Sequence, residues 1–284
     1  MSENSFVLTV SCPDRRGIVS TVTRYLFDSG CNIIDSAQYG DKDNGRFFLR
    51  ISFASETGAS GAAIREGFAP ITREFDMTAA IHDSAVKTRT LLMVSKLGHC
   101  LVDLLYRHRI GALPIEIPVI VSNHRDFADV AAASGIPFRY LPVNADNRKA
   151  QEKTLAEIIA EERIDLVVLA RYMQILSPAI ADAMPGQIIN IHHSFLPSFK
   201  GARPYHQAHD RGVKLIGATA HYVTSDLDEG PIIEQAVERA THAMTGDEMA
   251  AVGRDIENKV LARAVQWHAE HRILVNGRRT VVFY

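Results

Sequence analysis

Short apolar runs of strand length alternate with segments of helical spacing through the chain after residue 88. The predicted strands cover residues 91–95, 115–121, 138–141, 166–170 and 186–190. The predicted helices cover residues 98–109, 126–133, 148–161 and a short segment after Pro178. Strands that alternate with helices pair in parallel, because each helix carries the chain back across one face of the sheet. We therefore expect an open, mostly parallel α/β domain that spans residues 89–284.

The C-terminal part carries the signals of a long helix. Residues 245–248 read TGDE, a capping box in which the threonine and the glutamate satisfy backbone N–H groups at the helix start. Apolar residues then recur on one helix face, at Met249, Val252, Ile256 and Val260. Residues 280–283 are expected to add an edge strand.

The N-terminal part has a different pattern. Strands are expected over residues 6–11, 32–39, 46–53 and 76–82, and helices over residues 17–29 and 59–75. The order βαββαβ is that of the ferredoxin-like fold. The sequence therefore predicts a separate domain at residues 1–83, followed by a short polar linker at residues 84–88.

Composition excludes several classes of partner. The 284 residues carry a net charge of −2, which gives no general attraction to nucleic acid or to an anionic membrane. The start MSENS lacks the basic residues of a signal peptide, and no apolar run reaches membrane-spanning length. Cys12, Cys31 and Cys100 are widely spaced, so they fit neither a disulfide framework nor a zinc motif. We expect a cytoplasmic protein with reduced cysteines.

The sequence NIHHS at residues 190–194 places an amide and an imidazole two positions apart at the end of a predicted strand. Strand side chains alternate, so Asn190 and His192 face the same side. Ligands bind at the carboxyl ends of strands in open α/β sheets. A second strand-like run at residues 217–223 leads into a polar loop that contains Asp228. An amide donor, an imidazole and a carboxylate suit attack on a carbonyl carbon, so we predict acyl chemistry without a metal at these three residues.

Other kinds of site fit the sequence less well. Five histidines lie between residues 192 and 221, but His206 and His209 lack the spacing of HExxH and no cysteine or carboxylate completes a zinc ligand set. The turn at residues 95–100 has one glycine, too few for a phosphate or dinucleotide cradle. No GxSxG string is present, so Ser194 is expected to be structural. We predict no metal and no cofactor.

Residues 12–18 (CPDRRGI) and 29–34 (SGCNII) resemble the ACT domain, a small module that often binds amino acids and pairs with another copy. The resemblance implies that the ligand or dimer edge is lined by Asp14, Gly17, Asn32 and Ile33. The start of a helix favours a bound carboxylate. Fold alone does not establish function, so two readings stay open: the module binds an amino-acid effector, or it only joins copies into a homo-oligomer.

Segments of the second domain resemble the folate-dependent formyltransferase family. They are VLARYMQILSP at residues 168–178, IINIHHSFLP at 188–197, GATAHYV at 217–223 and LDEGP at 227–231. The catalytic Asn, His and Asp of that family match Asn190, His192 and Asp228. His193, the string GARPYHQ at residues 201–207 and the ACT-like module resemble the branch of the family that hydrolyses 10-formyltetrahydrofolate.

The resemblance implies that the substrate is 10-formyltetrahydrofolate and that the products are tetrahydrofolate and formate, within the one-carbon metabolism that serves purine biosynthesis. Asn190 would donate to the oxyanion, His192 would stabilise it and manage the proton needed by N10, and Asp228 would orient or deprotonate water. The residues expected to bind the substrate are Met173, Gln174, Ile175, Leu176, Val223, Thr224 and Leu227. Gln174 stands where relatives commonly carry arginine, so the contacts on the pterin side are expected to differ there.

Two other functions stay open at this point. One is formyl transfer to an amine acceptor; the other is an amino-acid-binding regulator with a vestigial catalytic domain. Relatives that act on glycinamide ribonucleotide hold its phosphate with a glycine- and serine-rich turn, whereas this chain has KLGHC at residues 96–100, which favours water as the acceptor. The intact catalytic trio argues against a vestigial domain. Weaker candidates are Lys200 and Arg203 for the folate glutamate tail, and His99 and Asp103 as residues facing the crevice.

Overall fold

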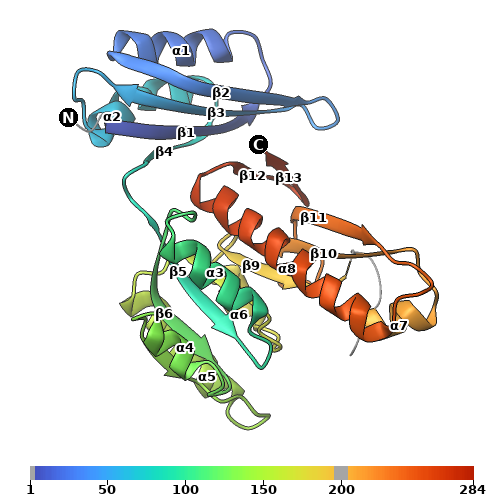
Figure 1. Ribbon diagram of the computed structural model, residues 1–284. Coiled ribbons are helices and arrows are strands. Elements are labelled where there is room, and N and C mark those ends of the chain that lie inside the picture. The colour runs from blue at the N-terminus through green and yellow to red at the C-terminus, as the bar shows by residue number, and fades with distance from the viewer. Residues whose placement is uncertain (1–3, 195–203) are drawn as a thin grey trace. The chain divides into compact units, whose positions relative to one another are not determined.

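The computed structural model describes residues 4–194 and 204–284, and the chain folds into two compact units (Figure 1). The first unit comprises Met1–Lys87, Glu270–Asn276 and Thr280–Tyr284. The second comprises Thr88–Ala269 and Gly277–Arg279. The expected boundary near residues 84–88 coincides with the first change of unit, but two C-terminal segments that we had placed in the second domain group with the first unit.

The first unit contains the expected βαββαβ order. Its elements are β1 (Asn4–Pro13), α1 (Ile18–Asp28), β2 (Cys31–Asp41), β3 (Arg46–Ser55), α2 (Gly61–Glu74) and β4 (Thr78–Asp83). The strands form an antiparallel sheet in the order β2-β3-β1-β4. The ferredoxin-like, ACT-like fold predicted for this part is therefore present.

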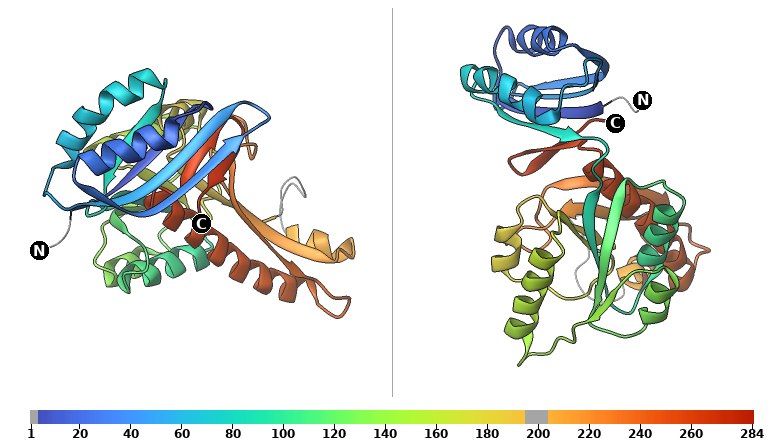
Figure 2. Two further views of the ribbon diagram at one scale, coloured as in Figure 1. Left: turned by 90° about the horizontal axis from the view of Figure 1, so that it is seen from above. Right: turned by 90° about the vertical axis from the view of Figure 1, so that its left-hand side faces the viewer.

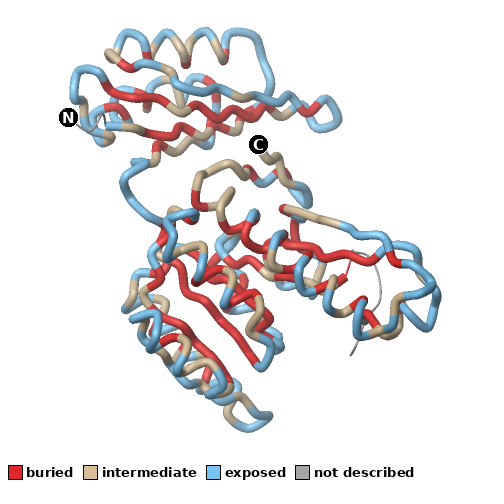
Figure 3. The backbone as a smooth tube through the Cα atoms, viewed as in Figure 1, coloured by how far each residue is buried: buried red, intermediate tan, exposed pale blue. Residues whose placement is uncertain are grey.

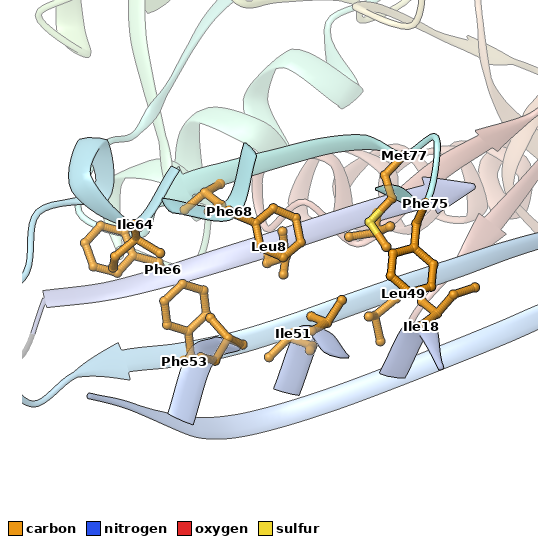
Figure 4. Close-up of a cluster of buried hydrophobic side chains, with 14 of the residues drawn as sticks. Phe6, Leu8, Ile18, Leu49, Ile51, Phe53, Ile64, Phe68, Phe75 and Met77 are labelled. Atoms are coloured by element: carbon orange, nitrogen blue, oxygen red, sulfur yellow. The ribbon is translucent and has the colours of Figure 1, made fainter. Parts of the chain in front are cut away.

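One face of this sheet is covered by α1 and α2. Alternate residues of the central strands point into the shared core, as Leu8 of β1 and Ile51 of β3 do at 0% exposure (Figure 4). Val22 of α1 and Phe68 of α2 close the core from the helix side. Cys12 and Cys31 are free and buried, and burial raises the pKa of each thiol. These two cysteines are therefore packing residues of the core.

The opposite face of β3 receives the C-terminal hairpin of β12 (Ile273–Asn276) and β13 (Arg279–Val282). Leu274 and Phe283 pack against Phe48 in a small buried cluster. The Asn276 amide donates to Asp41 Oδ2 at 2.7 Å, and Arg50 donates to the carbonyls of Glu270 and His271. The strand expected at residues 280–283 thus pairs with β12 rather than with the edge of a larger sheet.

The second unit is built on a seven-stranded sheet in the order β11-β10-β9-β8-β5-β6-β7. Its elements are β5 (Thr88–Val94), α3 (His99–Arg109), β6 (Ile115–Ser122), α4 (Ala128–Ala133), β7 (Phe138–Tyr140), α5 (Arg148–Glu161), β8 (Leu166–Leu169), α6 (Pro178–Ala183), β9 (Ile188–His192), α7 (Pro204–Asp210), β10 (Leu215–Tyr222), β11 (Ile232–Arg239) and α8 (Gly246–Ala269). Strands β7, β6, β5, β8 and β9 run parallel, and β10 and β11 are antiparallel. The sheet is mostly parallel, as predicted.

Helices cover both faces of this sheet (Figure 2). Residues of α5 and α6 share one core with alternate residues of the central strands, such as Leu91 and Val167. Helix α8 lies along β9, β10 and β11 and also contacts α3. The central strands are almost entirely buried (Figure 3), which explains their continuous apolar sequence.

The predicted capping box is present at the start of α8. Thr245 N–H donates to Glu248 Oε2 at 2.7 Å, and Glu248 N–H donates to Thr245 Oγ1 at 3.2 Å. These bonds fix where the 24-residue helix begins. Within the described part of the chain, no helix has both the length and the apolar character needed to cross a membrane.

Candidate active site

Strand β9 positions Asn190 and His192 near the centre of the sheet, where β8 and β10 flank it. The strand begins at Ile188 and ends at His192, two residues later than the prediction, so His192 is its last residue rather than part of the following loop. Across the antiparallel pair with β10, Asn190 lies opposite His221. Alternation along the strand directs the Asn190 and His192 side chains to the same face.

The loop between β10 and β11 brings Asp228 back to β9. This loop closes tightly, because Tyr222 N–H donates to Pro231 O at 2.9 Å. A Cβ atom at Gly230 would lie 1.7 Å from the Tyr222 carbonyl oxygen, so only glycine permits this close approach. Asp228 itself has a φ of 57°, in the left-handed region. A strained non-glycine residue of this kind often marks a functional position.

Asn190, His192, His221 and Asp228 form one connected cluster. Asp228 Oδ1 lies 3.4 Å from His192 Nδ1 and 3.8 Å from His221 Nε2. The hydrogen bond from His192 lowers the pKa of Asp228, against burial, which raises it. The Asp228 carboxylate is therefore ionised at neutral pH. The other ring nitrogen of His192, Nε2, is buried and has no hydrogen-bond partner among the residues that the structure describes.

The hydrogen-bond partners of His221 determine which of its ring nitrogens carries the hydrogen. Its Nδ1 lies 2.9 Å from the Tyr222 carbonyl oxygen, which only accepts, so Nδ1 carries the hydrogen. Its Nε2 then accepts from the Asn190 amide at 3.3 Å. Burial lowers the pKa of His221, which keeps the ring neutral. This contact orients Asn190 with its nitrogen toward the cluster.

A cavity of about 480 Å³ opens over this cluster. The described residues that line it include all ten predicted for catalysis and substrate binding, namely Asn190, His192, Asp228, Met173, Gln174, Ile175, Leu176, Val223, Thr224 and Leu227. The other residues of the described lining are not among these ten, namely Leu169, Arg171, Tyr172, Ile191, His193, His221, Ser225 and Asp226. His221 could not be assigned from spacing alone, because its place depends on the register of β9 against β10.

The wall formed by residues 171–176 combines large apolar side chains with Arg171 and Gln174, and its backbone is anchored by hydrogen bonds. Met173 and Ile175 are each 55% exposed, although both are large apolar residues. Met173 N–H donates to Ser95 Oγ at 3.0 Å, and Ser95 Oγ in turn donates to Asn123 Oδ1 at 2.7 Å. A preformed slot with apolar walls and a few polar groups is the usual form of a small-molecule site.

His193 stacks on His192, with ring centroids 5.0 Å apart and planes at 11°. Burial is the main cause that lowers the pKa of His193 to about 4, and the charges of Arg171 and His192 act in the same direction. His193 is therefore neutral at physiological pH. The stack thus places an uncharged ring directly against His192.

Behind the cavity, Glu257 of α8 is 1% exposed and binds three side chains. His99 Nε2 lies 2.7 Å from Oε2, Tyr205 OH donates to Oε1 at 2.9 Å, and Arg171 Nε lies 3.4 Å from Oε2. Among the described residues, the one group with metal-ligand spacing is His99, Cys100 and Glu257, within 4.8 Å of one another. The Arg171 cation already neutralises this carboxylate, and burial raises the pKa of the Cys100 thiol well above its usual value. The cluster is therefore better suited to an internal ion pair than to a cation.

The weaker sequence candidates fall elsewhere. Lys200 and Arg203 lie outside the described residues. His99 binds Glu257 and Asp103 binds Arg107, and neither is among the described residues that line the cavity.

In the first unit, the four candidate effector residues do not meet within one chain. Asp14 and Gly17 follow the last residue of β1, which pairs with the first residue of β3. Asn32 and Ile33 of β2 pair with residues near the other end of β3. At about 3.3 Å per residue, the two groups are roughly 20 Å apart along β3.

Both units match known protein families. Residues 88–265 match the formyl transferase family model, and residues 6–62 match the ACT domain. Formyltetrahydrofolate deformylase of Bacillus subtilis is 48% identical, over 99% of this chain and 95% of that protein. The crystal structure of formyltetrahydrofolate deformylase from Burkholderia mallei is 51% identical with a TM-score of 0.95, over 99% of this chain and 100% of that one.

A transferase matches a smaller share of the chain. Glycinamide ribonucleotide transformylase 1 from Symbiobacterium toebii is 31% identical with a TM-score of 0.66, and the match covers 70% of this chain and 95% of that one. The similarity to the deformylases includes both units. By this full-length similarity, the chain belongs to the formyltetrahydrofolate deformylase family.

Proposed function

We propose that the chain hydrolyses 10-formyltetrahydrofolate to tetrahydrofolate and formate in the cavity above β9. The observation that carries this proposal is the convergence of Asn190, His192 and Asp228 at one cavity, in a chain similar over its whole length to formyltetrahydrofolate deformylases. These residues supply a hydrogen-bond donor, a proton carrier and a carboxylate, which together suffice for hydrolysis of an N-formyl group.

Asn190 is the proposed oxyanion donor. One of its amide hydrogens points to His221 Nε2, which leaves the second for the formyl oxygen as negative charge develops there. His192 Nε2 is buried and has no partner within residues 4–194 and 204–284, so a proton on it would also face the reacting group. Preorganised donors of this kind act without the reorganisation that water requires.

Asp228 and His192 are the proposed residues for the two proton transfers of the reaction. Asp228 accepts a proton from water as the water oxygen bonds to the formyl carbon. His192 then gives a proton to N10 as the bond between carbon and N10 breaks, so that N10 leaves as an amine and formate remains. The ionised state of Asp228 and its 3.4 Å contact with His192 Nδ1 support this assignment. General acid–base help of this kind contributes about 10² to 10⁴ in rate.

The pterin is proposed to lie between the wall of Met173, Gln174, Ile175 and Leu176 and the loop that carries Val223, Thr224 and Leu227. The exposed apolar side chains of both walls support this pose, because an aromatic ring system would shield them from water.

Incubation of the purified protein with 10-formyltetrahydrofolate alone tests the function, with tetrahydrofolate and formate both measured. Stoichiometric release of both products without an added amine is expected. A requirement for an amine acceptor would instead identify a formyltransferase, and no turnover in either condition would leave only the regulator hypothesis. Chelators and added metals should not change the rate, since the proposed steps use side chains alone.

Substitution of Asp228 by asparagine tests the mechanism. We expect kcat to fall by about 10² to 10⁴, with a smaller change in KM, because the substitution removes the base but keeps the shape of the side chain. Asp226→Asn is the matched control, because it changes another carboxylate of the same loop. Release of formate by Asp228→Asn at the wild-type rate would exclude a role for this carboxylate in water activation.

We further propose that the protein is cytoplasmic, that it supplies tetrahydrofolate and formate to one-carbon metabolism and purine biosynthesis, and that its ACT-like unit binds an amino-acid effector within a homo-oligomer. The match of residues 6–62 to the ACT domain supports the effector. The order of the first sheet supports assembly, since β2 and β4 are its outer strands.

A further inference from the structure

The turn between β5 and α3 is filled by side chains of the protein itself. It follows the first strand of the second unit, and in open α/β sheets such a turn and the helix after it form the usual place for a phosphate. Gly98 leaves room in this turn, but the ring of Phe127 takes it, since a Cβ atom at Gly98 would lie 2.1 Å from that ring. Ser95 Oγ donates to Asn123 Oδ1 and accepts from Met173 N–H. The glycine and the serine of the turn are thus both used within the chain.

A carboxylate lies beside the first turn of α3. Glu257 of α8 is 1% exposed, and its Oε2 lies 2.7 Å from Nε2 of His99, the first residue of α3. Tyr205 OH donates to Oε1 at 2.9 Å, and Arg171 Nε lies 3.4 Å from Oε2. Burial alone would raise the pKa of Glu257, but the hydrogen bond from His99 and the charge of Arg171 bring it below its usual value. The protein therefore places an anion of its own at this position.

The side chains around Glu257 are of the kinds that bind phosphate. A guanidinium, an imidazole and a hydroxyl all donate hydrogen bonds, and arginine pairs with phosphate as well as with carboxylate. The Nε and Nη1 atoms of Arg171 have no hydrogen-bond partner among the described residues, so Glu257 does not use all the donors of this cation. Arg171 also lines the cavity above β9. The position that Glu257 fills is therefore next to the proposed site of hydrolysis.

We propose that Glu257 is a specificity-determining residue: its carboxylate occupies the place that the phosphate of an amine acceptor would take, so that water is left as the nucleophile. The inference rests on the proposed function and deepens it, because it gives a physical reason for hydrolysis rather than transfer. An approaching phosphate would meet both a filled volume and a buried like charge, and each of these excludes it.

Calorimetry and thermal unfolding of Glu257→Ala test the inference, with inorganic phosphate as the ligand and chloride at matched ionic strength as the control. The substitution removes the carboxylate and leaves room for an anion between the three donors. Phosphate should bind to this variant, and at about ten times its dissociation constant it should raise the Tm of the second unit by about 3 to 6 °C. The wild type should show neither binding nor a rise in Tm.

Two further variants separate an anion site from a loss of packing. Glu257→Gln makes the same change of charge but keeps the space filled, so phosphate should not bind to it. Arg171→Met/Glu257→Ala keeps the space but lacks the cation, so the gain in Tm should disappear. No gain in Glu257→Ala, or an equal gain in the wild type or in either control variant, would overturn the inference.

Refolding replaces the thermal scan if Glu257→Ala does not fold in chloride. Phosphate should then restore the native circular dichroism spectrum of this variant, because binding to the folded state alone stabilises it. An equally unfolded protein in phosphate and in chloride would overturn the inference as well.

Glycinamide ribonucleotide, an amine that carries a phosphate, tests the acceptor part of the inference. It should bind to Glu257→Ala more tightly than inorganic phosphate does, and it should leave formate release by the wild type unchanged. Inhibition of the wild type, or binding to the variant no tighter than that of phosphate, would mean that Glu257 does not exclude an acceptor. If the wild type forms no formate from 10-formyltetrahydrofolate, the proposed function fails instead, and the phosphate measurements still decide whether Glu257 fills an anion site.

Discussion

His221 orients the side-chain amide of Asn190. Asn190 supplies two amide hydrogens, and His221 Nε2 accepts one of them at 3.3 Å. His221 is itself fixed by the carbonyl of Tyr222 and is 2% exposed, so it has little freedom to turn. The direction of the second Asn190 hydrogen is therefore set before substrate binds, which is the condition for an effective oxyanion donor.

A double-mutant cycle tests this arrangement. Asn190→Ala should lower kcat by about 10² to 10³, and His221→Phe by up to about 10², because the phenyl ring fills the space but cannot accept the amide hydrogen. The double variant should lose little more than Asn190→Ala alone, since the two residues act through one bond. Steady-state kcat and KM of all four proteins provide the check. Fully additive losses would mean that His221 acts on the reaction independently of Asn190.

At the scale of elements, the local signals of the sequence predicted most of the fold. Helix α5 (Arg148–Glu161) begins and ends where predicted, and the TGDE capping box starts α8 as expected. Strand β11 and helix α7 were not predicted. Strand β11 lies at the edge of the sheet and Ile233 is its one buried residue, so its sequence shows no clear alternation. Strand alternation and family resemblance predicted that the side chains of β9 and the loop after β10 meet at one site. The partners of His221 were not predicted, because they depend on the register of β9 against β10, which local sequence does not determine.

The C-terminal hairpin was not predicted as part of the first unit, because its contacts are with residues more than two hundred positions away. Phe283 is 7% exposed and packs with Leu274 on Phe48 of β3. Phe283→Ala should therefore lower the free energy of unfolding of the first unit by about 3 kcal/mol. Val275→Ala, at a position 49% exposed on the same hairpin, should change it by less than about 0.5 kcal/mol. Urea denaturation measures the free energy of unfolding of both variants, and hydrogen exchange in β3 assigns the change to this unit. A loss for Phe283→Ala as small as that for Val275→Ala would show that the hairpin is not needed for this unit.

At the scale of the whole molecule, the position of the effector residues bears on assembly. Asp14 and Asn32 lie at opposite ends of β3, roughly 20 Å apart, too far for one amino acid to touch both within a chain. A site that uses both must therefore take Asp14 from one copy and Asn32 from another. In a two-fold assembly, each such site would occur twice.

Complementation between two defective variants tests this shared site. Asp14→Ala and Asn32→Ala should each abolish effector binding, measured by calorimetry with the amino acid that binds the wild type. A mixed dimer contains one site with both native residues and one with neither, so random reassociation of equal amounts should restore about a quarter of the wild-type sites. The wild type treated in the same way controls for losses during dissociation. Failure of the mixture to bind, while its chains do exchange, would mean that Asp14 and Asn32 do not belong to one shared site. Binding by either variant alone would show that the effector uses only one end of the sheet.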